Sequence, residues 1–371
     1  ARDYPDLHPP EASGAEVMRD CYALFDGSHV VVVGGAGFVG SNLVRALLDG
    51  SKPARITVID NLLSSEQFNL PENPNLRFIE GSITDDRILT QLSDDVDYYF
   101  QLATYHGNQS SIANPLEDHE NNTLTTLKLY DRIRDFKKIC KVVYSSAGCT
   151  VAEKTFNVPR ATTEEDPVSL YLDSPYQMSK IIGEMYSNYY FMHYGLPVVK
   201  ARFQNVYGPG EVLGAGRWRG TPATVWRNVT PTFIYRSIKG MPLIVENEGK
   251  ATRDFIYVKD IVDGLVRCAA VGKPGEVYNL AGGAETSILE LANLINSMTG
   301  SSAPVEIGPR RDWDHSGRRF GSTEKAKGAL GFEVKVGLKQ GLAETISWTR
   351  ENIERIDACI AKHERYTRLS G

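Results

Sequence analysis

The sequence has few cysteines and no long apolar run, and these absences exclude several classes of protein. Its 371 residues include five cysteines, and none of them forms a Cys-x-x-Cys pair. This spacing argues against a disulfide framework and a zinc site, and it favours the reducing cytoplasm. The seven histidines also lack metal-ligand spacing, so we expect no metal site. No apolar stretch approaches the ~18 residues that a membrane-spanning helix needs.

No charge of one sign dominates the chain either. The 41 Lys and Arg residues and 46 Asp and Glu residues give a net charge of −5. This balance argues against a broadly basic nucleic-acid-binding protein. The length allows two domains with a sizeable core. Residues 1–14 are polar and contain prolines, unlike a signal peptide, so we expect a cytoplasmic protein.

Strand and helix patterns alternate through the first 205 residues. Apolar, β-branched runs predict strands at residues 29–33, 55–59, 75–79, 96–102, 141–144 and 197–203. Helical patterns lie between them at residues 38–48, 116–136 and 177–194. This alternation predicts an α/β fold with a doubly wound, Rossmann-type parallel sheet and helices on both faces.

The alternation gives way to glycine-containing loops and mixed short elements after Tyr207. Helices are expected there at residues 288–298 and 338–360. We therefore predict a smaller mixed α/β C-terminal domain over residues 206–251 and 282–371. The Rossmann domain is predicted over residues 29–205 and about 252–281. Residues 1–28 are predicted to be an N-terminal extension with a short helix at 15–25.

A glycine-rich loop spans Gly34 to Gly40, directly after the first strand and at the start of a helix. Glycines at such positions permit a tight turn, close approach of a pyrophosphate to the backbone and close helix packing. The free N–H groups of the helix start favour phosphate. The loop therefore predicts a dinucleotide site, with contacts from Gly34, Gly37, Phe38, Val39 and Gly40.

The acid at the end of the second strand indicates which dinucleotide binds. Asp60 lies 60 − 40 = 20 residues after the last glycine, close to the spacing expected for a carboxylate that binds the ribose 2′-hydroxyl. Such an acid repels a 2′-phosphate, so we predict NAD rather than NADP. Asn61 follows as a further contact, and Ser82 and Ile83 at the end of the third strand are expected to flank the adenine.

Tyr176 and Lys180 are four residues apart on a predicted helix, so they lie one turn apart on the same face. A nearby ammonium group favours the phenolate and lowers the pKa of tyrosine. Such a tyrosine can act as a general base on a hydroxyl while a hydride leaves the same carbon. Taken alone, this spacing is weak evidence, because an ordinary surface Tyr–Lys pair is the commoner case.

Together these motifs resemble the extended short-chain dehydrogenase/reductase family, in particular its NAD-dependent nucleotide-sugar epimerases and dehydratases. The resemblance covers roughly residues 29–350. It rests on the glycine loop, Asp60, Leu102-Ala103, Asn122, Ser145-Ser146, the Tyr176/Lys180 pair, and the segments 202–209 and 253–258. Several independent motifs in one order are more specific than any one of them.

The resemblance implies roles for further residues. Ser146, or its neighbour Ser145, would hydrogen-bond the sugar hydroxyl and orient Tyr176, and Lys180 would also bind the nicotinamide ribose. Leu102, Ala103 and Asn122 would contact NAD. Asn205, Asn228 and Arg253 would contact the nucleotide sugar, and Arg318 is a further candidate for its phosphates. His106 follows the fourth strand near the nicotinamide, where it could contact the substrate or make a structural hydrogen bond. Arg217 lies in a basic stretch at residues 211–228, similar to one in GDP-mannose 3,5-epimerases, and could bind an anion. The resemblance also implies a homodimer, joined through the helices at 116–136 and 177–194 as a four-helix bundle.

The residues after the serines distinguish the reactions of this family. Dehydratases carry an Asp-Glu pair there and glucuronate decarboxylases carry a Glu, whereas this sequence has Ala147 and Gly148. Neither residue can transfer a proton. The sequence therefore favours C4 epimerisation of a UDP-linked sugar through a transient 4-keto form, as a step in the synthesis of surface polysaccharide.

Other reactions stay open as alternatives. Cys149 is similar to a cysteine of GDP-mannose 3,5-epimerases, which suggests a 3- or 5-epimerase as one alternative. A sugar dehydratase, a decarboxylase and a non-catalytic NAD-binding regulator of the same fold are the others. The second half also offers Arg310, Arg311 and Arg319 beyond the pair that a diphosphate needs. Because a carboxylate suits a bidentate arginine, a uronate is a further hypothesis for the sugar.

Overall fold

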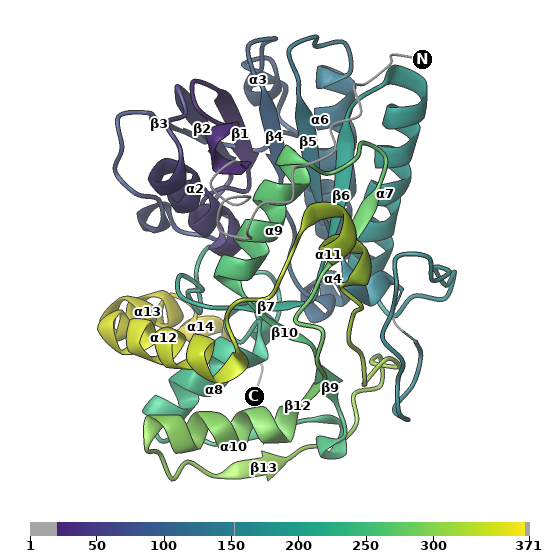
Figure 1. The fold of residues 1–371 in the computed structure, drawn as a ribbon. Coiled ribbons are helices and arrows are strands. Elements are labelled where there is room, and N and C mark those ends of the chain that lie inside the picture. Colours follow the sequence, from purple (N-terminus) through teal and green to yellow (C-terminus); the bar gives the residue numbers. More distant parts are fainter. Residues whose placement is uncertain (1–20, 152, 368–371) are drawn as a thin grey trace.

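The computed structural model describes residues 21–151 and 153–367. Most of the predicted extension, including residues 15–20 of its helix, lies outside these ranges. The first half of the chain, with a segment at residues 258–280, forms a seven-stranded parallel sheet with helices on both faces (Figure 1). Its strand order is β11-β6-β5-β4-β1-β2-β3. This order is that of a dinucleotide-binding Rossmann fold extended by one strand, and it confirms the predicted fold class.

The six predicted strands are present, and a seventh joins them at the edge. The strands are β1 (His29–Val33), β2 (Arg55–Asp60), β3 (Leu76–Glu80), β4 (Tyr98–Gln101), β5 (Lys141–Ala147), β6 (Val198–Phe203) and β11 (Val277–Leu280). The longer helices against them are α2 (Phe38–Gly50), α6 (Thr125–Ile133), α7 (Pro175–Tyr194) and α9 (Val258–Ala270). Short helical turns lie between them at α3 (Asp86–Leu89), α4 (Asn108–Ala113), α5 (Pro115–Asp118), η1 (Gln67–Asn69), η2 (His119–Leu124) and η3 (Gly148–Thr150).

The alternation of side chains along β1 explains the two helical layers. Val30 and Val32 pack with Leu43 of α2 in one cluster, which also includes residues of α9. Val31 and Val33 face the other side and pack in a second cluster with Leu129 of α6. Successive residues of a strand point to opposite faces, so a fully apolar strand requires a cover on both.

The predicted helix at residues 116–136 is divided in the structure. It consists of α5, the π-helical turn η2 and α6, which ends at Ile133. The wider turn places Asn122 and Thr123 in the buried interior. The predicted helix at 338–360 is also divided, because α12 (Leu338–Glu351) ends before Asn352 and α13 (Ile353–Ala361) follows it.

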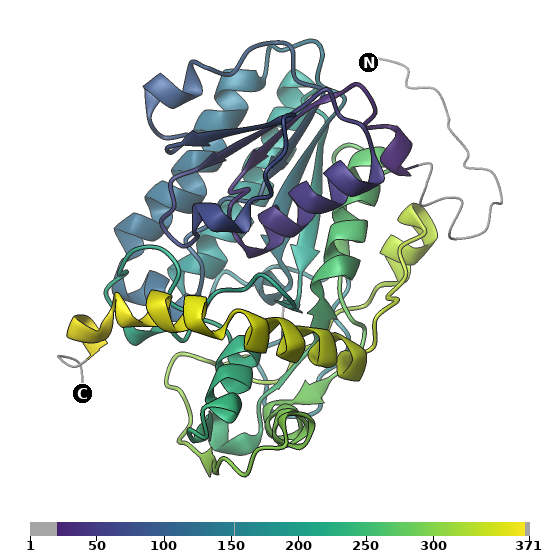
Figure 2. The ribbon, with the colours of Figure 1, turned by 90° about the vertical axis from the view of Figure 1, so that its left-hand side faces the viewer.

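The second half of the chain forms a smaller mixed α/β part below the sheet. Its strands pair two by two, as β7 (Asn205–Tyr207) with β10 (Phe255–Tyr257), β9 (Thr252–Arg253) with β12 (Thr286–Ser287), and β8 (Leu243–Val245) with β13 (Val305–Ile307). The helical elements are η4 (Pro222–Thr224), α8 (Val229–Ile238), η5 (Asn247–Gly249), α10 (Ile288–Thr299), α11 (Glu324–Leu330), α12, α13 and α14 (Glu364–Thr367). Figure 2 shows α12 and α13 crossing the molecule between the sheet and α8.

Membrane-spanning helices and disulfide bonds are both expected to be absent, and the structure can be examined for each in the described residues. In the described ranges, no helix combines the length and the apolar character that crossing a bilayer requires. The five cysteines all lie in these ranges, and each is a free thiol.

Candidate active site

A cavity of about 610 Å³ opens where the parallel strands end and the second half begins. Residues at the carboxyl ends of β1, β2, β4, β5 and β6 line its upper part, together with the start of α2. Segments from the second half line its lower part, including parts of α8 and the loop at residues 311–319. In open α/β sheets this edge is where ligands bind.

The glycine-rich loop forms one wall of the cavity. Gly34 has a φ of +80°, and a Cβ there would lie 2.5 Å from the backbone nitrogen of Ala103. A Cβ on Gly40 would lie 2.3 Å from the carbonyl oxygen of Gly34, so neither position accepts a side chain. α2 begins directly after Gly37, and no side chain caps it. These free N–H groups and the positive end of the helix fit the pyrophosphate of a dinucleotide.

Asp60 connects this loop to the segment that follows β2. Its carboxylate accepts hydrogen bonds from Ala36 N–H at 3.0 Å, Leu62 N–H at 2.9 Å and the Ser65 hydroxyl at 2.8 Å. Burial raises the pKa of Asp60, and the donors oppose that rise. Asp60 also lines the cavity wall, where its carboxylate can face a ribose hydroxyl.

Most of the other predicted cofactor contacts also line the cavity, namely Phe38, Val39, Asn61, Ser82, Ile83, Leu102 and Ala103. Asn122 does not. Its side chain accepts from Tyr105 N–H at 2.6 Å and donates to Asp118 at 2.8 Å and Ser179 at 3.0 Å. It therefore supports the wall from behind and fixes α7 to the preceding helical segment.

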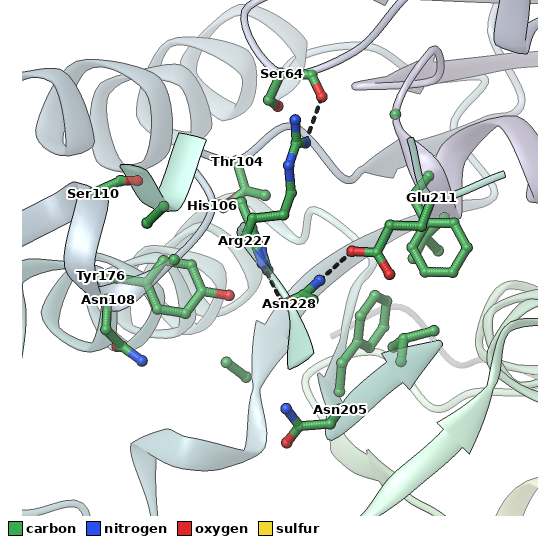
Figure 3. Close-up of a pocket in the computed structure, with 18 of the residues that line it drawn as sticks. Ser64, Thr104, His106, Asn108, Ser110, Tyr176, Asn205, Glu211, Arg227 and Asn228 are labelled. Carbon is green, nitrogen blue, oxygen red and sulfur yellow. Dashed lines mark hydrogen bonds between the residues drawn. The ribbon is translucent and has the colours of Figure 1, made fainter. Parts of the chain in front are cut away.

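The predicted Tyr–Lys pair lies on the first turns of α7. The Ser174 side chain caps this helix by accepting from Gln177 N–H, and the Tyr176 hydroxyl points into the cavity (Figure 3). Lys180 Nζ lies 5.8 Å from the centroid of the Tyr176 ring and donates to the Ser145 carbonyl at 3.0 Å. Burial raises the pKa of Tyr176, so the unliganded protein holds a neutral phenol there.

The two predicted serines both line the cavity at the end of β5, but their hydroxyls are bonded within the protein. The Ser145 hydroxyl donates to the Gln101 carbonyl at 3.1 Å. The Ser146 hydroxyl donates to Glu184, which also pairs with Arg202. A substrate contact from either hydroxyl would need a change of hydrogen-bond partner.

Cys149 lies in η3, directly after β5, and lines the cavity near Tyr176 and Lys180. Burial raises the pKa of its thiol, and the charges of Arg319 and Arg253 oppose this rise. The protonated thiol therefore dominates at neutral pH, which makes it a weak base.

A chain of three side chains crosses the floor of the cavity in Figure 3. His106 Nε2 lies 3.0 Å from Asn228 Oδ1, and the Asn228 amide donates to Glu211. Burial lowers the pKa of His106 to about 4 and raises the pKa of Glu211 to about 7. The His106 ring is therefore neutral, and it packs edge-on against the ring of Tyr176 at 6.2 Å between centroids.

The remaining predicted substrate contacts divide into two groups. Asn205 and Arg253 line the cavity. Arg217 is exposed and donates to the Asn61 carbonyl at 3.4 Å, outside the lining. Arg318 also lies outside it, because its guanidinium is paired with Glu285 at 2.8 Å. The structure thus corrects the expectation that Arg217 and Arg318 face the substrate cavity.

The structure brings six further charged residues into the lining, namely Glu211, Arg227, Arg236, Glu246, Arg311 and Arg319. The many arginines at residues 217–227 and 310–319 indicate two positively charged segments of the sequence. They do not indicate which guanidinium group faces the cavity. Arg227 donates to the carbonyls of Ser64 and Ala215, each at 2.7 Å, and so fastens the second half to the segment after β2. In the described ranges, no cluster of His, Cys, Asp or Glu could hold a metal ion.

Lys180 leads to a prediction about pH. Burial lowers its pKa to about 8, while the charges of Asp118 and Cys149 act in the opposite direction. The protonated lysine is the form that favours deprotonation of Tyr176. We therefore expect kcat/KM to fall as the pH rises through about 8, measured with the nucleotide sugar that the protein turns over.

Replacing Asp118 tests whether Lys180 is the group that causes the fall of kcat/KM at alkaline pH, the alkaline limb of the pH profile. The negative charge of Asp118 raises the pKa of Lys180, so Asp118→Asn should move the limb to lower pH. The matched change Glu117→Gln, at an exposed position of the same short helix, should leave the limb in place. An unmoved limb in Asp118→Asn would mean that another group titrates.

The comparisons with known proteins agree with this geometry. Residues 30–281 match the model of the NAD dependent epimerase/dehydratase family. A UDP-glucose 4-epimerase of Mycolicibacterium smegmatis is 31% identical over 86% of this chain and 98% of its own. A UDP-N-acetyl-alpha-D-glucosaminuronate decarboxylase of Bacillus cytotoxicus is 29% identical over 86% of this chain and 97% of its own.

A solved structure is more similar. The Bordetella bronchiseptica enzyme WbmF in complex with NAD⁺ and UDP is 56% identical, with a TM-score of 0.84 over 93% of this chain and 99% of that one. The family model spans more than half of the chain, and the cavity carries the glycine loop and the acid that an NAD site needs. The chain is therefore an enzyme that belongs to the NAD-dependent epimerase/dehydratase family.

Proposed function

We propose that this enzyme inverts C4 of a UDP-linked sugar through a transient 4-keto form. The observation that carries the proposal is the composition of the reaction centre. The centre contains Tyr176 and Lys180. At the end of β5, however, it has Ala147 and then Gly148, and neither of these residues can transfer a proton. C4 inversion needs one base at one hydroxyl, whereas elimination needs a further acid and base.

The side chains of the cavity would share the work as follows. Tyr176 takes the proton of the C4 hydroxyl, and Lys180 stabilises the phenolate that results. Bound NAD supplies the acceptor that takes the hydride from C4 and returns it to the opposite face. The NAD⁺ and UDP in the structure of the 56% identical relative support both ligands for this chain.

Inversion requires the keto sugar to turn while its diphosphate stays bound. Arg253 and Arg311 would hold the diphosphate, since both line the lower part of the cavity. Asn205, Asn228 and His106 would offer neutral hydrogen-bond partners to the sugar on its way. A sugar held mainly through its diphosphate can present either face to the cofactor.

Epimerisation at C3 or C5 is the second candidate, because Cys149 lies in the lining beside Tyr176. The raised pKa of its thiol disfavours it as the base that would remove a carbon-bound proton. C4 epimerisation needs no such base.

The test is incubation of the purified protein with UDP-sugars in D₂O, read by NMR. We expect inversion at C4 without incorporation of deuterium, because the hydride returns from the cofactor. Deuterium at C3 or C5 would instead support the route through Cys149. Release of C6 as CO₂ would contradict the proposal and indicate a decarboxylase. Release of water would contradict it and indicate a dehydratase.

We further propose that the enzyme is a cytoplasmic homodimer built on α6 and α7. Met185 and Met192 of α7 are 56% and 70% exposed, and Leu116 of α5 is 83% exposed. Such apolar side chains on neighbouring helices fit the predicted four-helix interface.

A further inference from the structure

Arg253, Arg311 and Arg319 line the lower part of the cavity together with Arg236, and the first three differ in their partners. Arg253 is paired with Asp314 at 2.9 Å, and Arg311 is paired with Glu246. Arg319 is 8% exposed, and its guanidinium donates to the Ser316 hydroxyl at 3.2 Å. Among the described residues, no carboxylate lies within ion-pair distance of Arg319. The charge of Arg319 acts on Asp314, the partner of Arg253. The three guanidinium groups therefore share two carboxylates, Asp314 and Glu246, and an anion would balance the remaining positive charge.

The position of Arg319 separates it from the arginines assigned to the diphosphate. Its charge lowers the pKa of both the Tyr176 phenol and the Cys149 thiol, against the effect of burial on each. It also acts on Arg253, and all three residues line the same cavity as Arg319. This is the part of the cavity that the sugar ring would occupy, with C4 at Tyr176 and the anomeric phosphate towards Arg253.

Each acid that lines the cavity has a partner other than Arg319. Asp60 lies at the cofactor ribose, Glu211 is bonded to Asn228, and Glu246 is paired with Arg311. The charge of Arg319 interacts with those of Arg253 and Asp314, and it also acts on the neutral side chains of Tyr176 and Cys149. A neutral hydroxymethyl group would leave the excess positive charge of the arginines unbalanced, whereas a carboxylate matches the planar fork of Arg319 with two hydrogen bonds.

We propose that Arg319 binds a carboxylate at C6 of the sugar, so that the preferred substrate is a UDP-hexuronic acid rather than a neutral UDP-hexose. This inference rests on the proposed function, because C4 must lie at Tyr176, and Arg319 would then bind the C6 carboxylate in one of the two orientations of the sugar. It assigns to Arg319 a role in substrate selection, and the proton transfer remains with Tyr176.

The test compares binding of UDP-glucuronate, UDP-glucose and UDP to the purified holoenzyme by calorimetry. For Arg319→Gln we expect about 100-fold weaker binding of UDP-glucuronate and about equal binding of UDP-glucose and UDP. For Arg319→Lys, which keeps the charge but loses the fork, we expect a loss of roughly 10-fold. Retained UDP binding in each variant shows that the cavity is folded.

The matched control is Arg160→Gln, at an exposed arginine that pairs with Asp166 and lies outside the cavity lining. It should leave all three affinities unchanged. Equal weakening of UDP-glucuronate, UDP-glucose and UDP in Arg319→Gln would overturn the inference, because it would assign Arg319 to the diphosphate. Unchanged UDP-glucuronate binding in that variant would overturn it as well.

Turnover distinguishes this inference from the proposed function. If the wild-type protein inverts C4 of UDP-glucose and UDP-glucuronate with equal kcat/KM, the proposed function stands and the assignment of Arg319 fails. If UDP-glucuronate binds selectively through Arg319 but C4 is never inverted, the proposed function fails and the carboxylate site stands.

Discussion

Replacing Tyr176 by phenylalanine is expected to lower kcat by about 1000-fold, the range that removal of a positioned general base produces. The ring would still fill its place beside His106, so substrate and cofactor binding should change little. The measurement is the rate of C4 inversion at saturating UDP-sugar, combined with the affinity for UDP.

The matched control is Tyr171→Phe, which removes a phenol that is 88% exposed. Its rate should equal that of the wild type. A Tyr176→Phe variant that keeps a tenth or more of the wild-type rate would show that another group takes the C4 proton, and the proposed mechanism would then be wrong.

Replacing Glu184 by alanine is expected to lower the free energy of unfolding by about 3–5 kcal/mol, because it leaves a buried arginine without its partner. Glu184 is 5% exposed and Arg202 is 4% exposed, with two hydrogen bonds of 2.8 Å between them. Glu184 also accepts from Ser146, so the change removes three hydrogen bonds from the core beneath the active site. Urea unfolding measures the loss.

Two further variants test this explanation. Glu153→Ala removes an exposed partner of Arg160 and should cost less than about 1 kcal/mol. The double variant Glu184→Leu with Arg202→Met removes both charges and should recover most of the loss, since an apolar pair can replace a buried ion pair. If Glu184→Ala alone costs less than about 1 kcal/mol, the pair does not hold this part of the core.

The features that the sequence predicted well depend on neighbours in the chain. The glycine loop is such a case, because Gly34 and Gly40 contact each other within one turn. The alternating strands and helices are another, since each pattern is complete within a few residues. Asp60 could be predicted from a spacing of 20 residues after the last glycine, because the strand–helix–strand unit between them has a nearly fixed length.

The features that the sequence could not supply depend on distant contacts. The hydroxyl of Ser146 is bonded to Glu184, 38 residues further along, and nothing local to the serine signals this. Arg318 and Arg319 are neighbours, yet one pairs with Glu285 and the other lines the cavity. The π-helical turn in η2 could not be predicted from the spacing of apolar residues, because it changes the number of residues per turn at one place only.

The position of β11 in the sheet has a consequence for synthesis of the protein. Its residues pair with β6 from Val277↔Lys200 to Leu280↔Phe203, although more than seventy residues lie between the two strands in the sequence. During translation β6 therefore leaves the ribosome long before its outer neighbour exists. Until that neighbour emerges, the nascent sheet carries an open edge of unpaired N–H and C=O groups, which is the kind of surface that pairs wrongly with other chains.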